Sequence, residues 1–153
     1  MTVRSLTIDE YKKRVGSEIG VSEWILVDQP RVDQFADVTM DHQFIHVDPA
    51  KAAHTPLGVT VAHGYLTLSL LSAMAYDIVP QAAGAKMSLN YGFNKIRFLA
   101  PVKTGRRIRG RFHLQDFTER SKGEWMLTLA VTVEIEGEDK PALVAEWLSV
   151  TYV

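Results

Sequence analysis

The chain contains 153 residues, with 17 basic and 18 acidic side chains, no cysteine and a formal net charge of −1 at pH 7. Without a basic excess the protein is not expected to bind nucleic acid, and without cysteine it has no disulfide or thiolate metal site. The amino terminus shows no secretory leader, and the longest apolar stretch, residues 65–79, is too short and too polar for a membrane span. We therefore expect one cytoplasmic domain over residues 1–153, with no nucleic-acid or membrane partner.

The first half of the chain is predicted to be largely helical. One helix is expected near residues 9–15 and a short strand over residues 24–27. Asp28 is a suitable cap for the next helix, with Pro30 in its first turn. Apolar residues then recur at helical spacing, and this helix is expected to end near Thr39.

A loop is predicted after that helix, over residues 41–46. The pair Asp48-Pro49 is typical of a second helix start, here for a short helix that ends at about Ala53. Residues 55–58 carry the proline and glycine of a turn.

A long helix is predicted over residues 62–79, stopped by Pro80. Its side chains leave almost no polar face, which is typical of a helix that is buried on all sides. Such a helix needs a sheet that is large enough to surround it.

The second half of the chain supplies that sheet. Apolar residues alternate with polar ones as in half-buried antiparallel strands. The strands are expected at residues 87–98, with a kink at Gly92, and at residues 107–114, 125–135 and 143–153, the last being more central. Turns are expected at residues 121–123 and 136–139. The pattern predicts an α+β fold in which an antiparallel sheet wraps around one long central helix.

Residues able to do chemistry gather in two short stretches, Asp41 to His46 and His63-Gly64. They offer a carboxylate, imidazoles and a glycine at a helix start, which are the groups that move a proton and stabilise an oxyanion. Asp41 is equally suited to an ordinary turn, and His46 to a hydrogen-bonded interior histidine. The His42/His46 spacing is that of a metal pair, but no glutamate follows His42, so no metal is predicted.

Three motifs carry a resemblance to a known family: FADVTMDHQFIHVDP, VAHGYLTLSLLSA and NYGFNKIRFLAPV. In their order and spacing they resemble the MaoC-like dehydratases of the hot-dog fold, and in particular the single-domain (R)-specific enoyl-CoA hydratases. The likeness runs from about residue 17 to the carboxyl terminus. It implies a hot-dog fold and the addition of water to a trans-2-enoyl-CoA, giving an (R)-3-hydroxyacyl-CoA. CoA would then be part of the substrate, and no separate cofactor is expected.

The resemblance also implies roles for individual residues. The catalytic aspartate and histidine of the family match Asp41 and His46, and the glycine whose amide polarises the thioester carbonyl matches Gly64. The serine that lines the site matches Ser72. Many relatives have Asn-Pro between the catalytic pair, where this chain has Gln43-Phe44, so the supporting role of the asparagine passes to Gln43.

These residue types suit the hydration of an enoyl thioester. Asp41 is expected to take a proton from water while His46 positions that water, and the C2 proton comes either from His46 or from the same water. The first amides of a helix lack partners inside the helix, so the Gly64 amide can stabilise the enolate-like oxygen. His63 either holds the preceding loop by a hydrogen bond or contacts the substrate.

Several alternatives stay open at this point. Ser72 can simply bond the backbone one turn back, and the row Arg107, Arg109 and Arg111 forms either a solvated strand face or a contact for the CoA phosphates. The sheet leaves an edge strand that pairs readily, which together with the resemblance predicts a homodimer. The rival functions are a hot-dog acyl-CoA thioesterase, for which Asp77 is the only carboxylate on the helix, and a non-catalytic acyl-CoA-binding or nodulation-type accessory protein.

Overall fold

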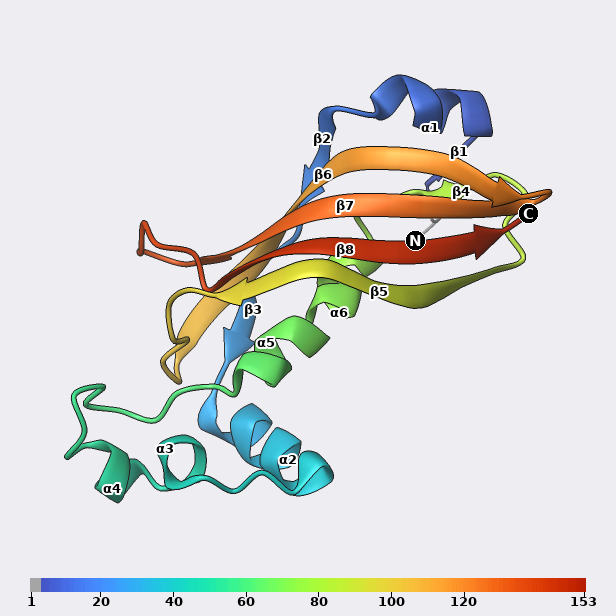
Figure 1. The fold of residues 1–153 in the computed structure, drawn as a ribbon. Coiled ribbons are helices and arrows are strands. Elements are labelled where there is room, and N and C mark those ends of the chain that lie inside the picture. Colours follow the sequence, from blue (N-terminus) through green and yellow to red (C-terminus); the bar gives the residue numbers. More distant parts are fainter. Residues whose placement is uncertain (1–3) are drawn as a thin grey trace.

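The computed structural model describes residues 4–153 and consists of a curled sheet that covers a central helical segment (Figure 1). Its helices are α1 (Ile8–Arg14), α2 (Gln29–Thr39), α3 (Phe44–Val47), α4 (Pro49–Ala52), α5 (Gly64–Ser69) and α6 (Leu71–Tyr76). Its strands are β1 (Ser5–Leu6), β2 (Ser17–Val21), β3 (Ile25–Val27), β4 (Gln81–Ala82), β5 (Met87–Phe98), β6 (Arg106–Ser121), β7 (Glu124–Ile135) and β8 (Leu143–Tyr152). The predicted α+β class is confirmed.

The main sheet has six antiparallel strands in the order β2-β6-β7-β8-β5, with β3 paired to the far end of β6. The expectation that the last strand is central is confirmed, because β8 lies between β7 and β5. Along β7 every odd position from Trp125 to Ile135 is buried, as the period-2 pattern predicts. The strand β5 is irregular on both sides of Gly92, where its register with β8 shifts.

The predicted helix starts in the first half are also confirmed. The Asp28 side chain accepts a hydrogen bond from the Arg31 amide at 3.1 Å and begins α2, which ends at Thr39. The Asp48 side chain accepts one from the Lys51 amide at 3.0 Å and begins α4. In Figure 1 the helices α2, α3 and α4 lie together below one end of the sheet, and α1 lies at its opposite side.

Two expectations need correction. The central helix is divided at Leu70 into α5 and α6, and it is not buried on all sides, since Tyr65 and Tyr76 are 69% and 70% exposed. The sheet covers only one side of it, and an all-apolar pattern does not distinguish a covered side from an uncovered one. Residues 41–46 were expected to form a loop, but His46 lies in the short helix α3.

The amino-terminal segment closes one end of the core. Strand β1 pairs in parallel with β4, so that Ser5 is opposite Gln81. Helix α1 buries Tyr11, whose ring stacks on Phe117 of β6 with centroids 4.5 Å apart. The Tyr11 hydroxyl donates a hydrogen bond to the Pro80 carbonyl, just after α6. These contacts tie residues from the start of the chain to the segment that follows the central helices.

The outer side of the sheet carries a ladder of ion pairs. Arg109 and Arg111 both contact Glu134, at 2.6 and 3.1 Å, and Arg107 pairs with Glu136 at 2.5 Å. This outer row of β6 was expected to be either a solvated face or a contact for phosphates. Because each arginine already has a carboxylate partner, the arrangement favours the solvated face. No helix within residues 4–153 is long and apolar enough to cross a membrane.

Candidate active site

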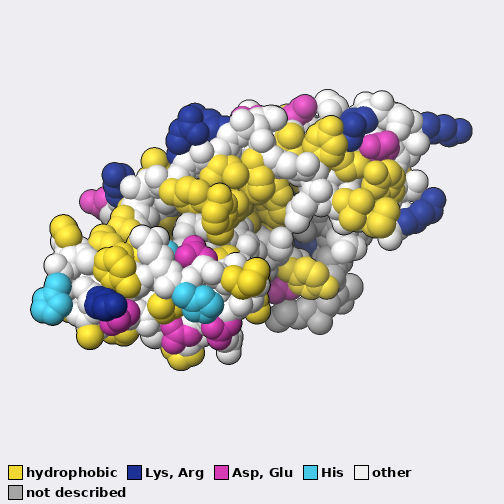
Figure 2. All heavy atoms as spheres, turned by 60° about the horizontal axis from the view of Figure 1, so that its bottom comes forward, with side chains coloured by type: hydrophobic (Ala, Val, Ile, Leu, Met, Phe, Trp, Pro, Cys, Tyr) yellow, Lys and Arg dark blue, Asp and Glu magenta, His cyan; other side chains and the backbone are white. Residues whose placement is uncertain are grey.

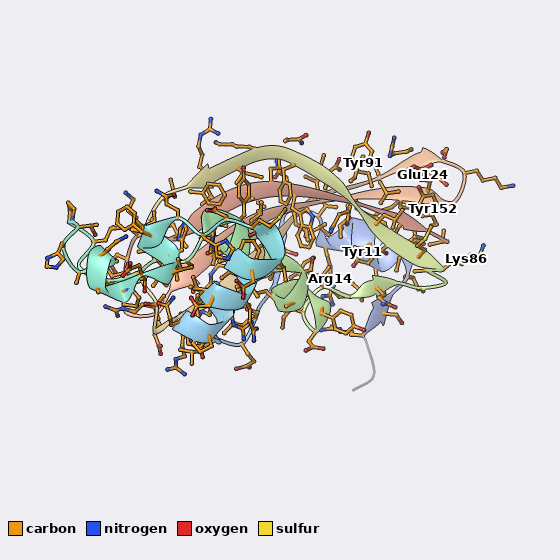
Figure 3. All side chains as sticks on the ribbon, turned by 90° about the horizontal axis from the view of Figure 1, so that it is seen from below. Tyr11, Arg14, Lys86, Tyr91, Glu124 and Tyr152 are labelled. Carbon is orange, nitrogen blue, oxygen red and sulfur yellow. The ribbon has the colours of Figure 1, made fainter. Side chains whose placement is uncertain are left out.

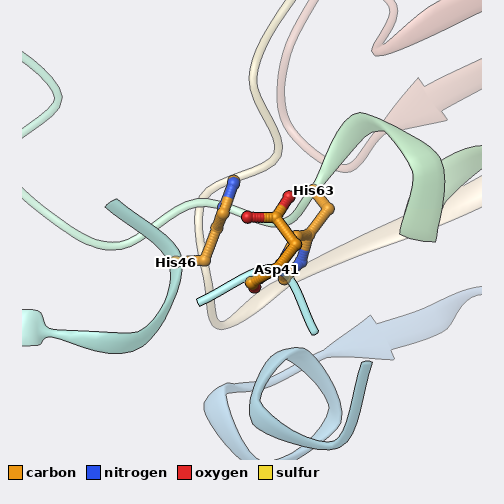
Figure 4. Close-up of side chains that lie close together, drawn as sticks. All are labelled: Asp41, His46 and His63. Atoms are coloured by element: carbon orange, nitrogen blue, oxygen red, sulfur yellow. The ribbon is translucent and has the colours of Figure 1, made fainter. Parts of the chain in front are cut away.

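The fold brings Asp41, His46 and His63 together at the start of α5 (Figure 4). Asp41 lies in the loop after α2, His46 in α3, and His63 directly before α5. One nitrogen or oxygen of each side chain lies within 4.8 Å of those of the other two. The two short stretches singled out in the sequence therefore form one cluster.

His46 is held in one tautomer by the backbone. Its Nδ1 lies 2.6 Å from the carbonyl oxygen of Val61, and because a carbonyl only accepts, this nitrogen carries the proton. Burial lowers the pKa of His46, and the charge of His63 lowers it further, while the Val61 bond and Asp41 act in the opposite direction. The imidazole is therefore neutral near pH 7, and its Nε2 presents a lone pair to the cluster.

His63 is fixed in the opposite tautomer. Its Nε2 donates to the backbone carbonyl of Asp41 at 2.9 Å, so its Nδ1 is an acceptor. The ring is 2% exposed and stacks on His46, with centroids 3.8 Å apart and planes inclined by 22°. Within residues 4–153 its Nδ1 is buried and has no hydrogen-bond partner. The bond to Asp41 agrees with the first of the two roles considered for His63.

The position of the Asp41 carboxylate is set by its own loop. Met40 ends α2 in the left-handed conformation, with φ of 60°, which turns the chain out of the helix axis. One Asp41 oxygen then accepts a hydrogen bond from the Gln43 amide at 3.3 Å. The carboxylate remains exposed on its other side, so it is open to a ligand.

The Gln43 side chain makes no contact with the cluster within residues 4–153, whereas the side chain of another glutamine, Gln29, bonds the backbone of His46. The Gln43 side chain is exposed and does not cap α3; its carbonyl accepts the His46 amide at 2.9 Å. The Gln29 side chain instead donates to the His46 carbonyl at 2.7 Å and accepts from the buried Thr60 hydroxyl at 2.5 Å. No sequence pattern indicates this contact, because Gln29 lies 17 residues from His46 along the chain, at the start of α2.

Gly64 is the first residue of α5, and His63 makes no side-chain cap there. The first amides of a helix have no partner inside it and point outward. A Cβ at position 64 would lie 3.0 Å from the Phe98 ring of β5, so the close approach of that ring favours glycine and a larger residue would displace it. The amide is thus next to the cluster, at an exposed position of the helix.

Ser72 does not join the cluster. It is exposed on α6, two helical turns from Gly64, where it lines a cavity of about 490 Å³ with β5 and β8. The alternative of a backbone bond one turn back is seen for Ser69, whose hydroxyl donates to the Tyr65 carbonyl at 2.6 Å. Ser72 therefore belongs to the surroundings of the central helices rather than to the Asp41–His46 pair.

The cluster has the residue types of a metal site, but its geometry does not fit one. A metal bound to histidine lies in the ring plane, about 2.0–2.1 Å from the nitrogen. The rings of His46 and His63 are nearly parallel and 3.8 Å apart, so their free lone pairs run side by side and do not converge. His42 is turned away from the cluster and bonds Asp37 at 2.9 Å. The three side chains together offer acceptors, which suits a molecule that donates hydrogen bonds.

Comparisons with known proteins identify the family and agree with the fold. A model of the MaoC like domain matches residues 10–136. Nodulation protein N of Rhizobium leguminosarum bv. viciae is 50% identical over 97% of this chain and 92% of its own length. The 3-hydroxyacyl-thioester dehydratase Z of Mycobacterium tuberculosis is 45% identical over 86% of each chain. The solved (R)-hydratase of A. caviae superposes with a TM-score of 0.69 at 24% identity, covering 88% of this chain and 94% of that one. This likeness confirms the hot-dog fold.

Proposed function

Because this chain belongs to the MaoC-like dehydratase family, we propose that it is an (R)-specific enoyl-CoA hydratase, which adds water reversibly to trans-2-enoyl-CoA. The observation that carries the proposal is the set of free acceptors at Asp41, His46 Nε2 and His63 Nδ1. Water has two O–H groups and fits between such acceptors. The name of the mycobacterial relative, a hydroxyacyl-thioester dehydratase, supports the same reaction in the reverse direction.

In the proposed reaction the water donates one hydrogen bond to Asp41 and one to His46 Nε2. Asp41 takes a proton as the water oxygen bonds to C3, and the π electrons of the double bond move toward the thioester oxygen. The Gly64 amide stabilises that oxygen while it carries negative charge. The proton taken from the water is then delivered to C2, so Asp41 is again a carboxylate, one whole water has been added, and no cofactor or redox partner is needed.

His63 acts in this proposal as a positioning residue. Its bond to the Asp41 carbonyl fixes the loop of the catalytic carboxylate, and its ring supports the face of His46. Gln29, through its bond to the His46 carbonyl, holds α3 in place. For Gln43 we propose only the backbone contacts to Asp41 and His46.

We also propose that the protein is a homodimer paired through β5. This strand bonds β8 on one side and is an edge of the main sheet within the described residues. Apolar side chains are exposed along it and on the neighbouring helices: Met87, Leu89, Tyr91, Phe98, Tyr65 and Tyr76. Figure 2 shows hydrophobic side chains gathered on this side of the molecule. A second copy fits best, because antiparallel pairing of two β5 strands is self-complementary and covers the same patch on both.

Two rival functions remain as outcomes of the test. A thioesterase would need a carboxylate on the central helices near the thioester, but Asp77 follows α6 and is exposed, far along the chain from Gly64. A non-catalytic acyl-CoA-binding protein would be consistent with the nodulation relative, whose name states no reaction. The free acceptors of the cluster favour the hydratase, since a binding protein has no need of unpaired buried nitrogen.

The proposal is tested with crotonyl-CoA, by the loss of enoyl absorbance and chiral identification of the product. We expect the (R)-alcohol from the native protein and a loss of hydration on the order of 10²–10⁴-fold in Asp41→Asn and in His46→Gln. Release of free CoA without loss of the enoyl group would instead indicate a thioesterase. Tight acyl-CoA binding without turnover at any chain length would indicate the binding protein.

The chain contains a matched control for these variants. Asp37 and His42 repeat the spacing and the chemistry of the catalytic pair, but both are exposed, at 75% and 53% of their side chains. We expect Asp37→Asn and His42→Gln to retain native turnover. Native circular dichroism in all four variants shows that a loss of activity does not come from misfolding.

A further inference from the structure

A cavity beyond the cluster has no role in the chemistry described so far. It measures about 490 Å³, is open on one side, and is bordered by the end of α6, by residues 79–86 and by the inner side of the sheet. Its floor is apolar, with Leu129 of β7 and Trp147 of β8. Three of the residues on the opposite wall are alanines, Ala75, Ala82 and Ala85, whose side chains occupy little of the space.

Two elements extend from the reaction centre to the cavity. The central helical segment begins at Gly64 and ends at the cavity, and its uncovered face carries Ser69 and Ser72. Strand β5 runs beside it in the same way, from Phe98 at Gly64 to Leu89 in the cavity wall. If the proposed function holds, a thioester bound at Gly64 therefore directs its acyl chain toward an apolar cavity.

Past the end of α6 this cavity is lined by Tyr11, which comes from the amino-terminal helix α1 and is labelled in Figure 3. The Tyr11 side chain is 2% exposed and stacks on Phe117, which in turn stacks on Trp125 with centroids 4.9 Å apart. Its hydroxyl is bonded to the Pro80 carbonyl, and burial raises the pKa of Tyr11 to about 12, so the hydroxyl stays protonated. Where Tyr11 lines it, the cavity is therefore bounded by an aromatic ring held in place by its contacts, and the Tyr11 hydroxyl is not available to a ligand.

We propose that Tyr11 is a specificity-determining residue, which limits the length of the acyl chain that the hydratase accepts. From Gly64 to Ser72 the helical segment advances about 12 Å, at 1.5 Å per residue. An extended acyl chain advances roughly 1.3 Å per carbon, given C–C bonds of about 1.5 Å, so about nine carbons are needed to reach Ser72. Chains of medium length then fill the cavity, and longer chains meet the Tyr11 ring.

The test compares Tyr11→Ala, Tyr11→Phe and the native protein on trans-2-enoyl-CoAs of four, eight, twelve and sixteen carbons. We expect the ratio of kcat/KM for the C16 substrate to that for the C8 substrate to rise at least tenfold in Tyr11→Ala. Tyr11→Phe keeps the ring and loses only the bond to Pro80, so its ratio stays within twofold of native. A folded Tyr11→Ala protein with the native length profile overturns the proposal.

A second variant covers the case in which Tyr11→Ala does not fold. Ala85→Leu fills the cavity from the opposite wall, at a partly exposed position that tolerates a larger side chain. We expect the kcat/KM ratio of the C12 to the C4 substrate to fall at least tenfold, and an unchanged ratio overturns the proposal.

Calorimetric binding of saturated C12 and C4 acyl-CoAs separates this proposal from the hydratase assignment. A native protein that hydrates no substrate but binds C12-CoA more tightly, with a preference lost in Ala85→Leu, refutes the hydratase and retains the cavity. Equal binding of both chain lengths refutes the cavity, and indicates that another part of the assembly fills it.

Discussion

Two groups of charged and titratable side chains lie on opposite sides of the same sheet, and they differ in how their polar atoms are used. On the outer side, Arg109 and Arg111 share Glu134, and Arg111 also reaches Glu18 at 2.7 Å. On the inner side, His46 and His63 each donate a hydrogen bond from one ring nitrogen to a backbone carbonyl, and the other ring nitrogen has no such partner. The outer group is complete within the protein, whereas the inner group lacks a partner.

This difference helps to separate structural from functional polar residues. An unpaired buried acceptor destabilises the fold by about 1–3 kcal/mol, so it persists in a protein only where something compensates for it. Paired surface charges carry no such disadvantage, and they contribute little to stability in either direction. The row of arginines is conspicuous in the sequence, but these side chains are already paired. The histidines are less conspicuous, and each keeps one ring nitrogen available to bond a reactant.

Apart from the Asp41 and His46 variants described above, the largest effect is expected from a change at Gly64, next to the inner group. Gly64→Ala places a methyl group 3.0 Å from the Phe98 ring and beside the amide that we assign to the oxyanion. We expect kcat to fall on the order of 10²-fold, similar to the loss of one oxyanion donor. Asp37→Asn, which lies outside the cluster, is again the control and should keep native turnover. Native kcat in a folded Gly64→Ala protein would rule out the amide as the oxyanion donor.

His63 distinguishes positioning from simple packing. Glutamine can place its amide near the position of Nε2 and restore the bond to the Asp41 carbonyl, while asparagine is too short. We expect kcat to fall about tenfold or more in His63→Asn, with less loss in His63→Gln, and KM to change little in both. The measurement is the separate kcat and KM for crotonyl-CoA. Equal losses in the two variants would mean that the ring, and not its hydrogen bond, is what matters.

The pH dependence should follow the neutral state of His46. Burial lowers the pKa of His46, so we expect the acid limb of kcat/KM to have its midpoint below the ordinary value of 6.5. Stability should follow with a defined sign: the unfolded chain binds the proton first, so folding is weakened as the pH falls from 6.5 to the lower folded pKa. Thermal unfolding of the native protein and of His46→Gln over this pH range checks the prediction. The variant should lack the decrease in stability with falling pH that comes from His46.

The smallest effect is expected on the outer side of the sheet. Glu134→Gln removes the carboxylate shared by two arginines, whose bonds lower the pKa of Glu134, with Arg109 as the largest cause. Such exposed pairs are typically worth about 0–1 kcal/mol, so the free energy of unfolding should change within that range and hydration should not change. Denaturant unfolding measures the first quantity and the crotonyl-CoA assay the second. A large loss of activity would show that the two sides of the sheet are coupled.

Much of the fold could be predicted from local patterns, because those patterns have local physical causes. Asp28 and Asp48 mark helix starts by bonding amides three residues ahead, and the alternation along β7 follows from the geometry of a strand. The roles of Asp41, His46 and Gly64 were assigned from the family resemblance. Local patterns could not supply the contacts between the two stretches, since His63 lies 22 residues from the Asp41 carbonyl that it bonds. A spacing rule cannot express a contact that the tertiary fold creates.

The features that escaped prediction are those that depend on tertiary contacts. The tautomers of His46 and His63 are set by the carbonyls of Val61 and Asp41, which no sequence pattern indicates. The bond of Gln29 to the His46 carbonyl forms because α2 and α3 pack together. The exposed side of α5 and α6 was also not predicted. An apolar helix face indicates contact with something other than water, but it does not say whether the contact comes from the same chain or from another.

The parallel pairing of β1 with β4 has a consequence for the order in which the molecule assembles. The contact of Tyr11 with Pro80 joins residues 69 positions apart, so it becomes favourable only after the intervening chain is compact. We expect α1 to dock late in folding and to open more readily than the β6–β8 hairpins, which hydrogen exchange would report as weaker protection. Helix α1, through Tyr11, then blocks the far end of the proposed acyl cavity. Undocking of α1 would open that end to solvent while the sheet stays folded.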